Sequence, residues 1–178
     1  APEDLARRKR GEFKDTAFWK ATVETNSEGK AELAFTLPDN LTRWQVESVG
    51  ITKDTKLGIA YKEFTSQKEL MVIPLQPRFV IPGDAFMIGA KVFNQTGATQ
   101  RLNVSFASET LTMTNDAKLQ SITLDAGDTQ TVYFNVQAPL ALDKGEHTFT
   151  LSAKNSSHED TVEERIPITE NITYETVA

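Results

Sequence analysis

The chain has two histidines, and a serine-type hydrolase would have to use one of them as its general base. His147 lies in "GEHTFTL", at the start of an alternating apolar segment, and His158 lies in the polar stretch "NSSHEDT". No Gly-x-Ser-x-Gly sequence is present that could place a nucleophilic serine on a strained strand-to-helix turn. We therefore expect both histidines at the surface and no catalytic residues in this chain.

Acidic pairs could offer the oxygen ligands that Ca²⁺ prefers, and they occur at Asp125/Asp128 and Glu159/Asp160. The stretch "DAGD" is also an ordinary hairpin turn in which Gly127 supplies a positive φ. We favour solvated turns for both pairs and expect no metal and no cofactor. The absence of cysteine from the chain excludes disulfides, thiolate metal sites, cysteine nucleophiles and a thioester formed by this chain.

Asn-x-Ser/Thr triplets could accept glycans in a secreted eukaryotic protein, or they could be chance products of a threonine-rich composition. The second interpretation is favoured here. The triplets begin at Asn40, Asn94, Asn103, Asn155 and Asn171.

The net charge of −6 argues against a nucleic-acid partner, because phosphates require a basic surface. A basic run, "ARRKRG", occupies residues 6–11 and is either a solvated tail or a patch for nucleic acid or membrane; we favour the tail. No apolar run of about 18 residues could insert into a membrane, and "APEDLARRKR" lacks the apolar region of a signal peptide.

Apolar residues alternate along most of the chain, which predicts antiparallel β-sheets with one wet face. Turn signals such as "NSEG", "PGD", "NQTG", "DAGD" and "DKG" separate the segments. The alternating sets are Ala31/Leu33/Phe35/Leu37, Phe86/Ile88/Ala90/Val92, Leu102/Val104/Phe106, Val132/Phe134/Val136, Phe149/Leu151/Ala153 and Val162/Ile166/Ile168.

The stretch "LPDNLTRWQV" (residues 37–46) predicts a sharp corner between two strands. Pro38 cannot donate to a ladder and should end one strand, and Asp39 and Asn40 should bond their own backbone in an Asx turn. Trp44 then returns an apolar group to the core, and Gly50 is expected at a bulge or a close packing point. Core packing is likewise expected for the aromatic set Phe13, Phe18, Trp19, Phe35 and Trp44.

A domain break is expected near residues 66–69, where polar "TSQKE" precedes the extended run "LMVIPLQPRFVIPGD". Residues beyond the break have the length and strand number of an immunoglobulin-like or fibronectin-like sandwich. Residues 12–66 supply too few strands for a closed sandwich. The chain is therefore expected to be all-β, with two antiparallel β-sandwich modules, the first of them incomplete.

Two blocks of sequence carry a resemblance to a known family. "FKDTAFWKATVETNSEGKAELAFTLPDNLTRWQVESVGIT" and "GIAYKEF" contain an aromatic-Thr-x-x-Trp strand, a Gly turn, a Pro-Asp-x-Leu-Thr-x-Trp corner and a Gly-hydrophobic strand. "PLQPRFVIPGDAFMIGAKVFNQTG" contains an extended Pro-Arg-Phe segment, a Pro-Gly-Asp turn and a strand that ends in Val-x-Asn. In this order the blocks resemble the macroglobulin-like domains of the α2-macroglobulin family, most closely its bacterial members.

The resemblance implies a division into residues 1–11, the exit or linker of the protease-cleaved bait region; residues 12–67, the C-terminal part of an interrupted macroglobulin-like domain; and residues 68–178, a complete one. A thioester domain would follow, and its Cys-x-x-Gln motif is absent here. The residues that match the family pattern are Phe13, Thr16, Trp19, Pro38, Asp39, Leu41, Thr42, Trp44, Pro77, Phe79, Gly83 and Asp84.

The function that the resemblance implies is non-catalytic support, next to the bait region, in a broad-spectrum protease-trapping inhibitor. Its partners would be target proteases and other domains of the same protein, with weak self-association of this piece. Its location would be the periplasm or cell envelope, with or without a lipid anchor, or outside the cell. Trypsin-like proteases should cut an exposed linker after Arg7, Arg8, Lys9 or Arg10.

The alternative is a tandem β-sandwich of a bacterial surface adhesin, which predicts two complete domains and no special sensitivity at residues 7–10. A carbohydrate-binding sandwich is a third option, but it would need exposed aromatic side chains on one sheet face.

Overall fold

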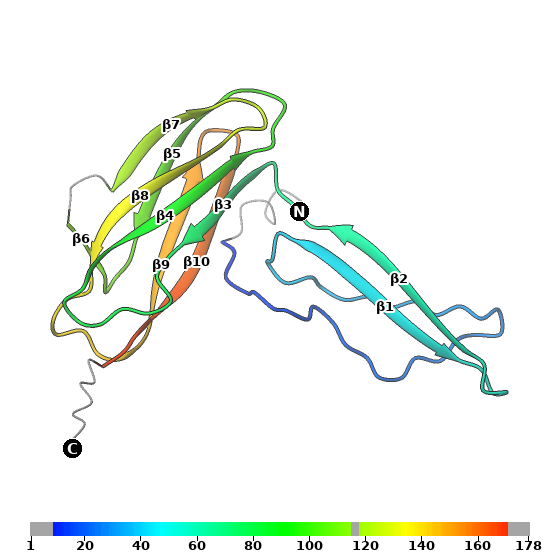
Figure 1. Cartoon of the computed structure of the whole chain (residues 1–178). Coiled ribbons are helices and arrows are strands. Elements are labelled where there is room, and N and C mark those ends of the chain that lie inside the picture. The colour runs from blue at the N-terminus through cyan, green and yellow to red at the C-terminus, as the bar shows by residue number, and fades with distance from the viewer. Residues whose placement is uncertain (1–8, 115–117, 171–178) are drawn as a thin grey trace, which may run out of the picture. The chain divides into compact units, whose positions relative to one another are not determined.

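The computed structural model describes residues 9–114 and 118–170 and divides the chain into two units. Unit 1 contains residues 9–11 and 68–170, and unit 2 contains residues 12–67. All the regular elements among the described residues are β-strands (Figure 1), which confirms the all-β prediction.

Unit 1 is a β-sandwich of two four-stranded antiparallel sheets. One sheet has the order β10-β9-β5-β7 and the other has the order β3-β4-β8-β6. The strands are β3 (Leu70–Leu75), β4 (Ala85–Asn94), β5 (Gln100–Ala107), β6 (Thr112–Met113), β7 (Leu119–Leu124), β8 (Thr129–Gln137), β9 (Gly145–Lys154) and β10 (Glu159–Ile168).

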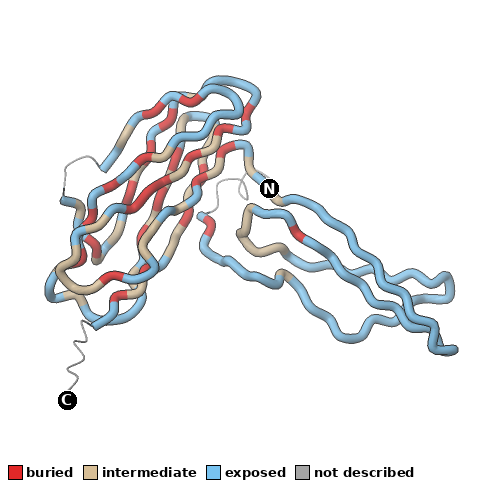
Figure 2. Tube along the Cα trace, viewed as in Figure 1, coloured by how far each residue is buried: buried red, intermediate tan, exposed pale blue. Residues whose placement is uncertain are grey.

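The core of unit 1 consists of the inward-facing positions of these strands. Every alternating segment predicted beyond residue 80 forms a strand, and its apolar set is buried, apart from the partly buried Phe86, because successive side chains of a strand point to opposite faces. Phe106 lies between Phe134 and Phe149, with ring centroids 5.9 and 5.8 Å apart, so these rings join the two sheets. Figure 2 shows the resulting alternation of buried and exposed positions along the strands.

The predicted turns of unit 1 have the geometry that their glycines allow. Gly83 in "PGD" has a φ of 92° and Gly127 in "DAGD" has a φ of 83°, as expected for turns that need the left-handed region. The amide of Gly83 donates to Ala138 O at 2.8 Å, and that of Gly127 donates to Asn94 O at 2.8 Å.

Unit 2 contains one two-stranded sheet, β1 (Arg43–Ile51) with β2 (Leu57–Thr65). The register runs without interruption from Arg43↔Thr65 to Ile51↔Leu57 and places Gly50 opposite Gly58. The prediction of a bulge or close packing at Gly50 is therefore wrong: the ladder is regular, and an added Cβ would meet nothing within 4 Å.

The remainder of unit 2 departs from the sequence prediction. Residues 31–37 were expected to form a strand, but they run extended outside any ladder, and a turn at Asn26, where Lys30 O accepts from the Asn26 amide at 2.8 Å, precedes them. Asp39 Oδ2 and Asn40 Oδ1 accept from the distant amides of Glu12 and Lys14 at 3.0 and 2.9 Å, so the predicted local corner is held by a tertiary contact.

The aromatic core expected in unit 2 is also wrong except at Trp44. Trp44 is 8% exposed, whereas Trp19 is 81% exposed, and Phe13, Phe18 and Phe35 are exposed as well. Figure 2 shows most of unit 2 as exposed. Phe18 and Phe35 stack on each other at 4.8 Å without a layer above them. The reason is that residues 12–67 form only one hairpin, preceded by a segment outside any sheet, and the face of a sheet stays exposed to water unless a second layer covers it.

The contrast between the units predicts opposite responses to the loss of an aromatic side chain. Phe149→Ala should lower the free energy of unfolding of unit 1 by about 3–5 kcal/mol, because it removes a fully buried ring and leaves a cavity. Trp19→Ala should change the stability of the isolated chain by less than about 0.5 kcal/mol, because that ring already faces solvent. Denaturant unfolding monitored by circular dichroism would measure both, and equal losses would contradict the incomplete core of unit 2.

Candidate functional site

The basic segment is joined to the sandwich of unit 1 at its described end, Lys9–Gly11. Arg10 forms a parallel bridge with Val162: the Arg10 amide donates to Thr161 O, and the Glu163 amide donates to Arg10 O, both at 2.8 Å. Residues 9–11 therefore lie along the outer edge of β10 as a short added strand, which we call the strap. A strap in this position satisfies edge groups that would otherwise face water or another chain.

The side chain of Arg10 turns into the sandwich. Its guanidinium donates from Nε to Asp160 Oδ1 at 3.0 Å and from Nη2 to Asp160 Oδ2 at 2.6 Å. The same Nη2 donates to Val72 O at 2.7 Å, and the residue is only 8% exposed. The two parallel bonds to one carboxylate are the fork geometry that arginine makes and lysine cannot reproduce.

Asp160 is the centre of this arrangement and is 0% exposed. Besides Arg10, it accepts from Lys68 Nζ at 2.8 Å and from the Val72 amide at 2.8 Å. Val72 belongs to β3, the edge strand of the other sheet. Arg10 and Asp160 thus bind the C=O and N–H of Val72 in place of a neighbouring strand, and they fasten β3 to β10 on the open side of the sandwich.

The electrostatics of Asp160 reflect two opposed effects. Burial raises the pKa of its carboxyl, but the hydrogen bonds and charge of Arg10, with the bonds from Lys68 and Val72, outweigh burial and hold the pKa below its ordinary value of 3.8. Further along β10, burial raises the pKa of the Glu164 carboxyl.

The strap corrects the sequence interpretation of the basic run. Arg10 does not lie in an exposed linker, because its backbone is paired with β10 and its side chain is buried. Lys9 remains half-exposed and pairs with Glu163, while Arg7 and Arg8 lie outside the described residues.

Asp160 is likewise not part of a solvated acidic turn. It shares the inward-facing set of β10 with Val162, Ile166 and Ile168, and an acid at such a position signals a buried cation as its partner. That period-two pattern was the available signal for this site.

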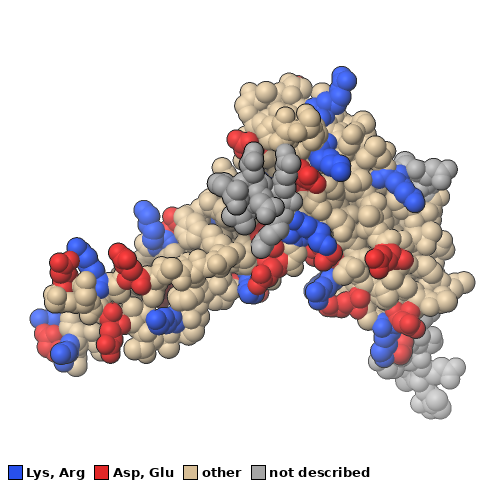
Figure 3. Space-filling model, turned by 180° about the vertical axis from the view of Figure 1, so that it is seen from behind, with Lys and Arg blue, Asp and Glu red and all other residues tan. Residues whose placement is uncertain are grey.

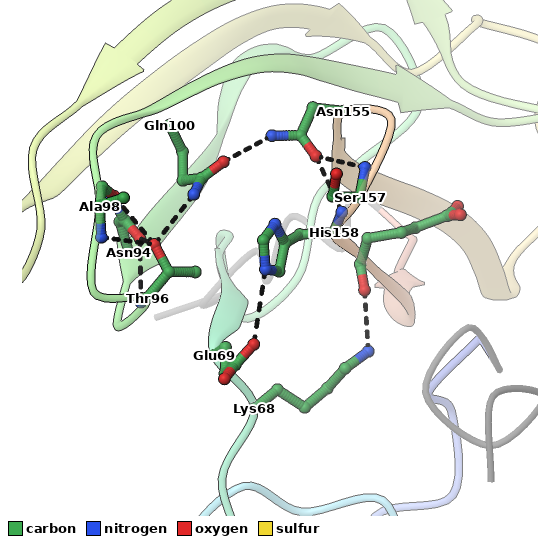
Figure 4. A network of polar contacts seen from close by, with 10 residues as sticks. Lys68, Glu69, Asn94, Thr96, Ala98, Gln100, Asn155, Ser157 and His158 are labelled. Atoms are coloured by element: carbon green, nitrogen blue, oxygen red, sulfur yellow. Dashed lines mark hydrogen bonds and ion pairs between the residues drawn. The ribbon is translucent and has the colours of Figure 1, made fainter.

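The other candidate residues do not converge. His147 Nε2 lies 2.8 Å from Asp143 O, and His158 Nε2 faces Glu69 Oε2 at 3.4 Å (Figure 4). Asp125 accepts from Thr99 Oγ1, in the connection between β4 and β5, at 2.7 Å. Within residues 9–114 and 118–170 no group of three or more metal-ligating side chains could hold a metal ion, and no helix is long and apolar enough to cross a membrane.

Asn94 has a structural role that the glycan interpretation does not anticipate. Its Nδ2 donates to Ala98 O, Leu124 O and Asp125 O at 2.9–3.0 Å, and its Oδ1 accepts from Thr96 (Figure 4). A fully buried amide with these partners fastens two turns together and offers no nitrogen to a glycan.

Charges of both signs are mixed over the surface. On the face seen in Figure 3, Lys and Arg side chains lie among Asp and Glu side chains. The described residues form several exposed ion pairs of this kind, such as Arg165 with Glu146 at 3.1 Å. Such pairs keep a surface solvated and contribute little to stability.

The residues that carry the family pattern lie in both units. In unit 2, Trp44 Nε1 donates to Ser66 Oγ at 3.0 Å, and Asp39 ties the corner to Glu12. In unit 1, Asp84 Oδ2 accepts from the Ile81 amide at 3.0 Å and closes the turn at Gly83. Of the others, Thr16, Pro38, Leu41 and Thr42 lie in unit 2 and Pro77 and Phe79 in unit 1.

The sequence model of the alpha-2-macroglobulin family matches residues 16–106, which extend from unit 2 into unit 1. The chain belongs to the alpha-2-macroglobulin family. The resemblance inferred from the two sequence blocks is thereby confirmed.

Bacterial alpha-2-macroglobulins are among the curated relatives of this alpha-2-macroglobulin-family chain. It is 34% identical over 98 residues to an alpha-2-macroglobulin homolog from Nostoc sp., which covers 55% of this chain and 5% of the relative. It is 25% identical over 157 residues to the alpha-2-macroglobulin of Thermotoga maritima, which covers 88% of this chain and 10% of the relative. The chain therefore spans only about a tenth or less of the length of these relatives.

Solved structures show the same fold. Trypsin-activated alpha-2-macroglobulin from Escherichia coli matches with a TM-score of 0.71 at 18% identity, covering 90% of this chain and 12% of that one. Methylamine-reacted alpha-2-macroglobulin from Salmonella matches with a TM-score of 0.62 at 20% identity, covering 80% and 10%. The two antiparallel units are thus macroglobulin-like.

The buried ion pair predicts an acid-sensitive component of stability. Because the pKa of Asp160 is depressed in the folded state, its contribution is fully present above the ordinary value of 3.8 and is lost as the pH falls through the folded value. Asp160→Asn should cost about 3–5 kcal/mol of unfolding free energy at pH 7, since it leaves Arg10 buried without a counter-charge.

Urea unfolding of both proteins between pH 7 and pH 2.5 would measure this component. The gap between wild type and Asp160→Asn should be constant above pH 5 and should narrow below pH 3.8. A gap that stays the same over the whole range would refute the role assigned to the carboxylate.

Proposed function

We propose that this chain is non-catalytic β framework of a protease-trapping inhibitor, adjacent to the segment that proteases cleave. The observation that carries the proposal is the lack of a buried hydrophobic core in unit 2. Its sequence matches the family, yet Trp44 is the single buried hydrophobic residue in residues 12–67, all of which are described. A unit that exposes Val49 and Ile59 on its hairpin and Trp19 outside it needs further strands of the same module to cover these side chains.

An interrupted module of this kind suits a trap. In the family, the bait region interrupts a macroglobulin-like domain, and its cleavage lets the surrounding domains repack around the protease. The Escherichia coli relatives were solved after activation by trypsin and by elastase, which supports proteases as the partners of the protein that carries this chain. Rigid sandwiches that move as bodies around a cut segment can drive such a change.

The pairing of the strap with β10 limits which residues of the basic run a protease can cleave. We propose that Arg7 and Arg8, with Lys9 at the margin, are the residues of the basic run that a trypsin-like protease reaches. Arg10 is excluded from this set because trypsin requires a free arginine side chain, and that of Arg10 is bound to Asp160 and Val72.

The remaining partners and the location follow from the family. We propose contacts with other domains of the same protein, no nucleic-acid partner and no direct membrane insertion. We also propose a periplasmic or cell-envelope location, with or without a lipid anchor, or secretion into the medium, because a protease trap must meet foreign proteases there.

A trapping assay on a longer polypeptide that carries this chain tests the function. After incubation with trypsin, the enzyme should keep its activity on a small peptide substrate and lose it on a large protein, because a trapped protease admits only small molecules. Loss of activity on both substrates, or on neither, would refute trapping. The triple variant Arg7→Gln/Arg8→Gln/Lys9→Gln should trap trypsin less and elastase equally well if the basic run is a cleavage site.

The uncovered hairpin predicts weak self-association of the 178-residue chain. Val49 and Ile59 are paired across the β1–β2 ladder and both are exposed, so two copies could cover each other's apolar face. Val49→Lys should make the sedimentation coefficient independent of concentration, whereas Lys53→Gln in the nearby turn should leave the wild-type concentration dependence intact. A wild-type chain that is strictly monomeric at high concentration would contradict this.

A further inference from the structure

Both chain connections to unit 2 converge on one carboxylate. The chain leaves unit 1 after Gly11 and returns to it at Lys68. Arg10, just before the exit, and Lys68, at the return, both donate to Asp160 Oδ1, at 3.0 and 2.8 Å. Residues 58 positions apart in the sequence are held at the same buried atom because the two edge strands β3 and β10 lie side by side there.

The two cations are not redundant. Arg10 donates to both carboxylate oxygens of Asp160 and also to the backbone carbonyl of Val72. Lys68 binds Oδ1 and also donates to Glu159 O at 3.1 Å, so it fixes the first residues of β10. A carboxylate without solvent access stays ionised only while its cations offset the loss of hydration.

Loss of either cation should therefore act on the other. With Arg10 withdrawn, Asp160 keeps one cation and the amide of Val72, and its burial becomes costly. The local way to regain hydration is for the start of β10, Glu159 and Asp160, to move out to water. That movement takes away both acceptors of Lys68 Nζ.

We propose that Asp160 is a shared anchor that couples the two chain connections of residues 12–67, so that release of the strap also loosens the junction at Lys68. The following consequence rests on the proposed function: a protease cut upstream that frees the strap would loosen the chain connections at both ends of unit 2. The coupling itself is a property of unit 1 and is testable without any trapping activity.

Trypsin reports on both connections, because Arg10 and Lys68 are themselves trypsin sites. In the native state their side chains are bound to Asp160, and trypsin needs them free. The neighbouring backbone is also held: Arg10 O accepts from Glu163, and Glu69 O accepts from Gln95 at 2.7 Å. The Arg10–Gly11 and Lys68–Glu69 bonds should therefore both resist cleavage in the wild-type chain.

Each alanine variant removes one site and leaves the other as the reporter. In Arg10→Ala, the initial rate of cleavage after Lys68 should rise about tenfold, and in Lys68→Ala the rate after Arg10 should rise by a similar factor. The matched control is Glu163→Gln, which removes only the exposed partner of Lys9 and should leave both rates unchanged. Mass spectrometry of the first cuts, before cleavage within residues 12–67 accumulates, gives the rates.

Cleavage after Arg101, an exposed residue in β5, distinguishes a local effect from general unfolding. A wild-type rate after Lys68 in Arg10→Ala would overturn the proposal, as would a change in only one direction, because a coupling free energy is reciprocal. A parallel rise after Arg101 would overturn it too, since the sandwich would then be opening as a whole. None of these outcomes bears on the trapping assay, so the two proposals can fail separately.

Discussion

The interaction on which the structure of unit 1 depends is the bidentate ion pair between Arg10 and the fully buried Asp160. A two-sheet sandwich has an open side where the edge strands of its sheets meet, and the backbone groups there need partners. In this chain the ion pair forms hydrogen bonds with the N–H and C=O of Val72, and the strap pairs with the edge of β10. These polar side chains can replace a strand at this edge because both carboxylate oxygens of Asp160 and both backbone groups of Val72 have hydrogen-bond partners.

The two units differ in how much of their apolar surface they bury within themselves. Unit 1 buries a continuous apolar core between two sheets, whereas unit 2 presents aromatic and aliphatic side chains to solvent around one hairpin. Both have sequences that match one family, so the difference reflects what each unit contains and not a different type of fold. An uncovered apolar face of this kind is a surface for further strands.

Under the proposed function, this arrangement has a mechanical role. The segment proposed for cleavage ends where the strap begins, and the strap is held at the same carboxylate as the return connection of unit 2. A single buried charge thereby links the chain on both sides of residues 12–67. Chemistry is not needed for such a role; what matters is which contacts hold before a cut and which are lost after it.

Sequence patterns were sufficient to predict the all-β class, the strands beyond residue 80, the turns at Gly83 and Gly127 and the family, because alternation, turn chemistry and motif order are local signals. The burial of Arg10 and the exposure of Trp19 depend on contacts between distant segments, which no local pattern contains. A basic run suggests a solvent-exposed segment until it pairs with a buried acid 150 residues away, and an aromatic residue suggests a core position until its own unit leaves it uncovered.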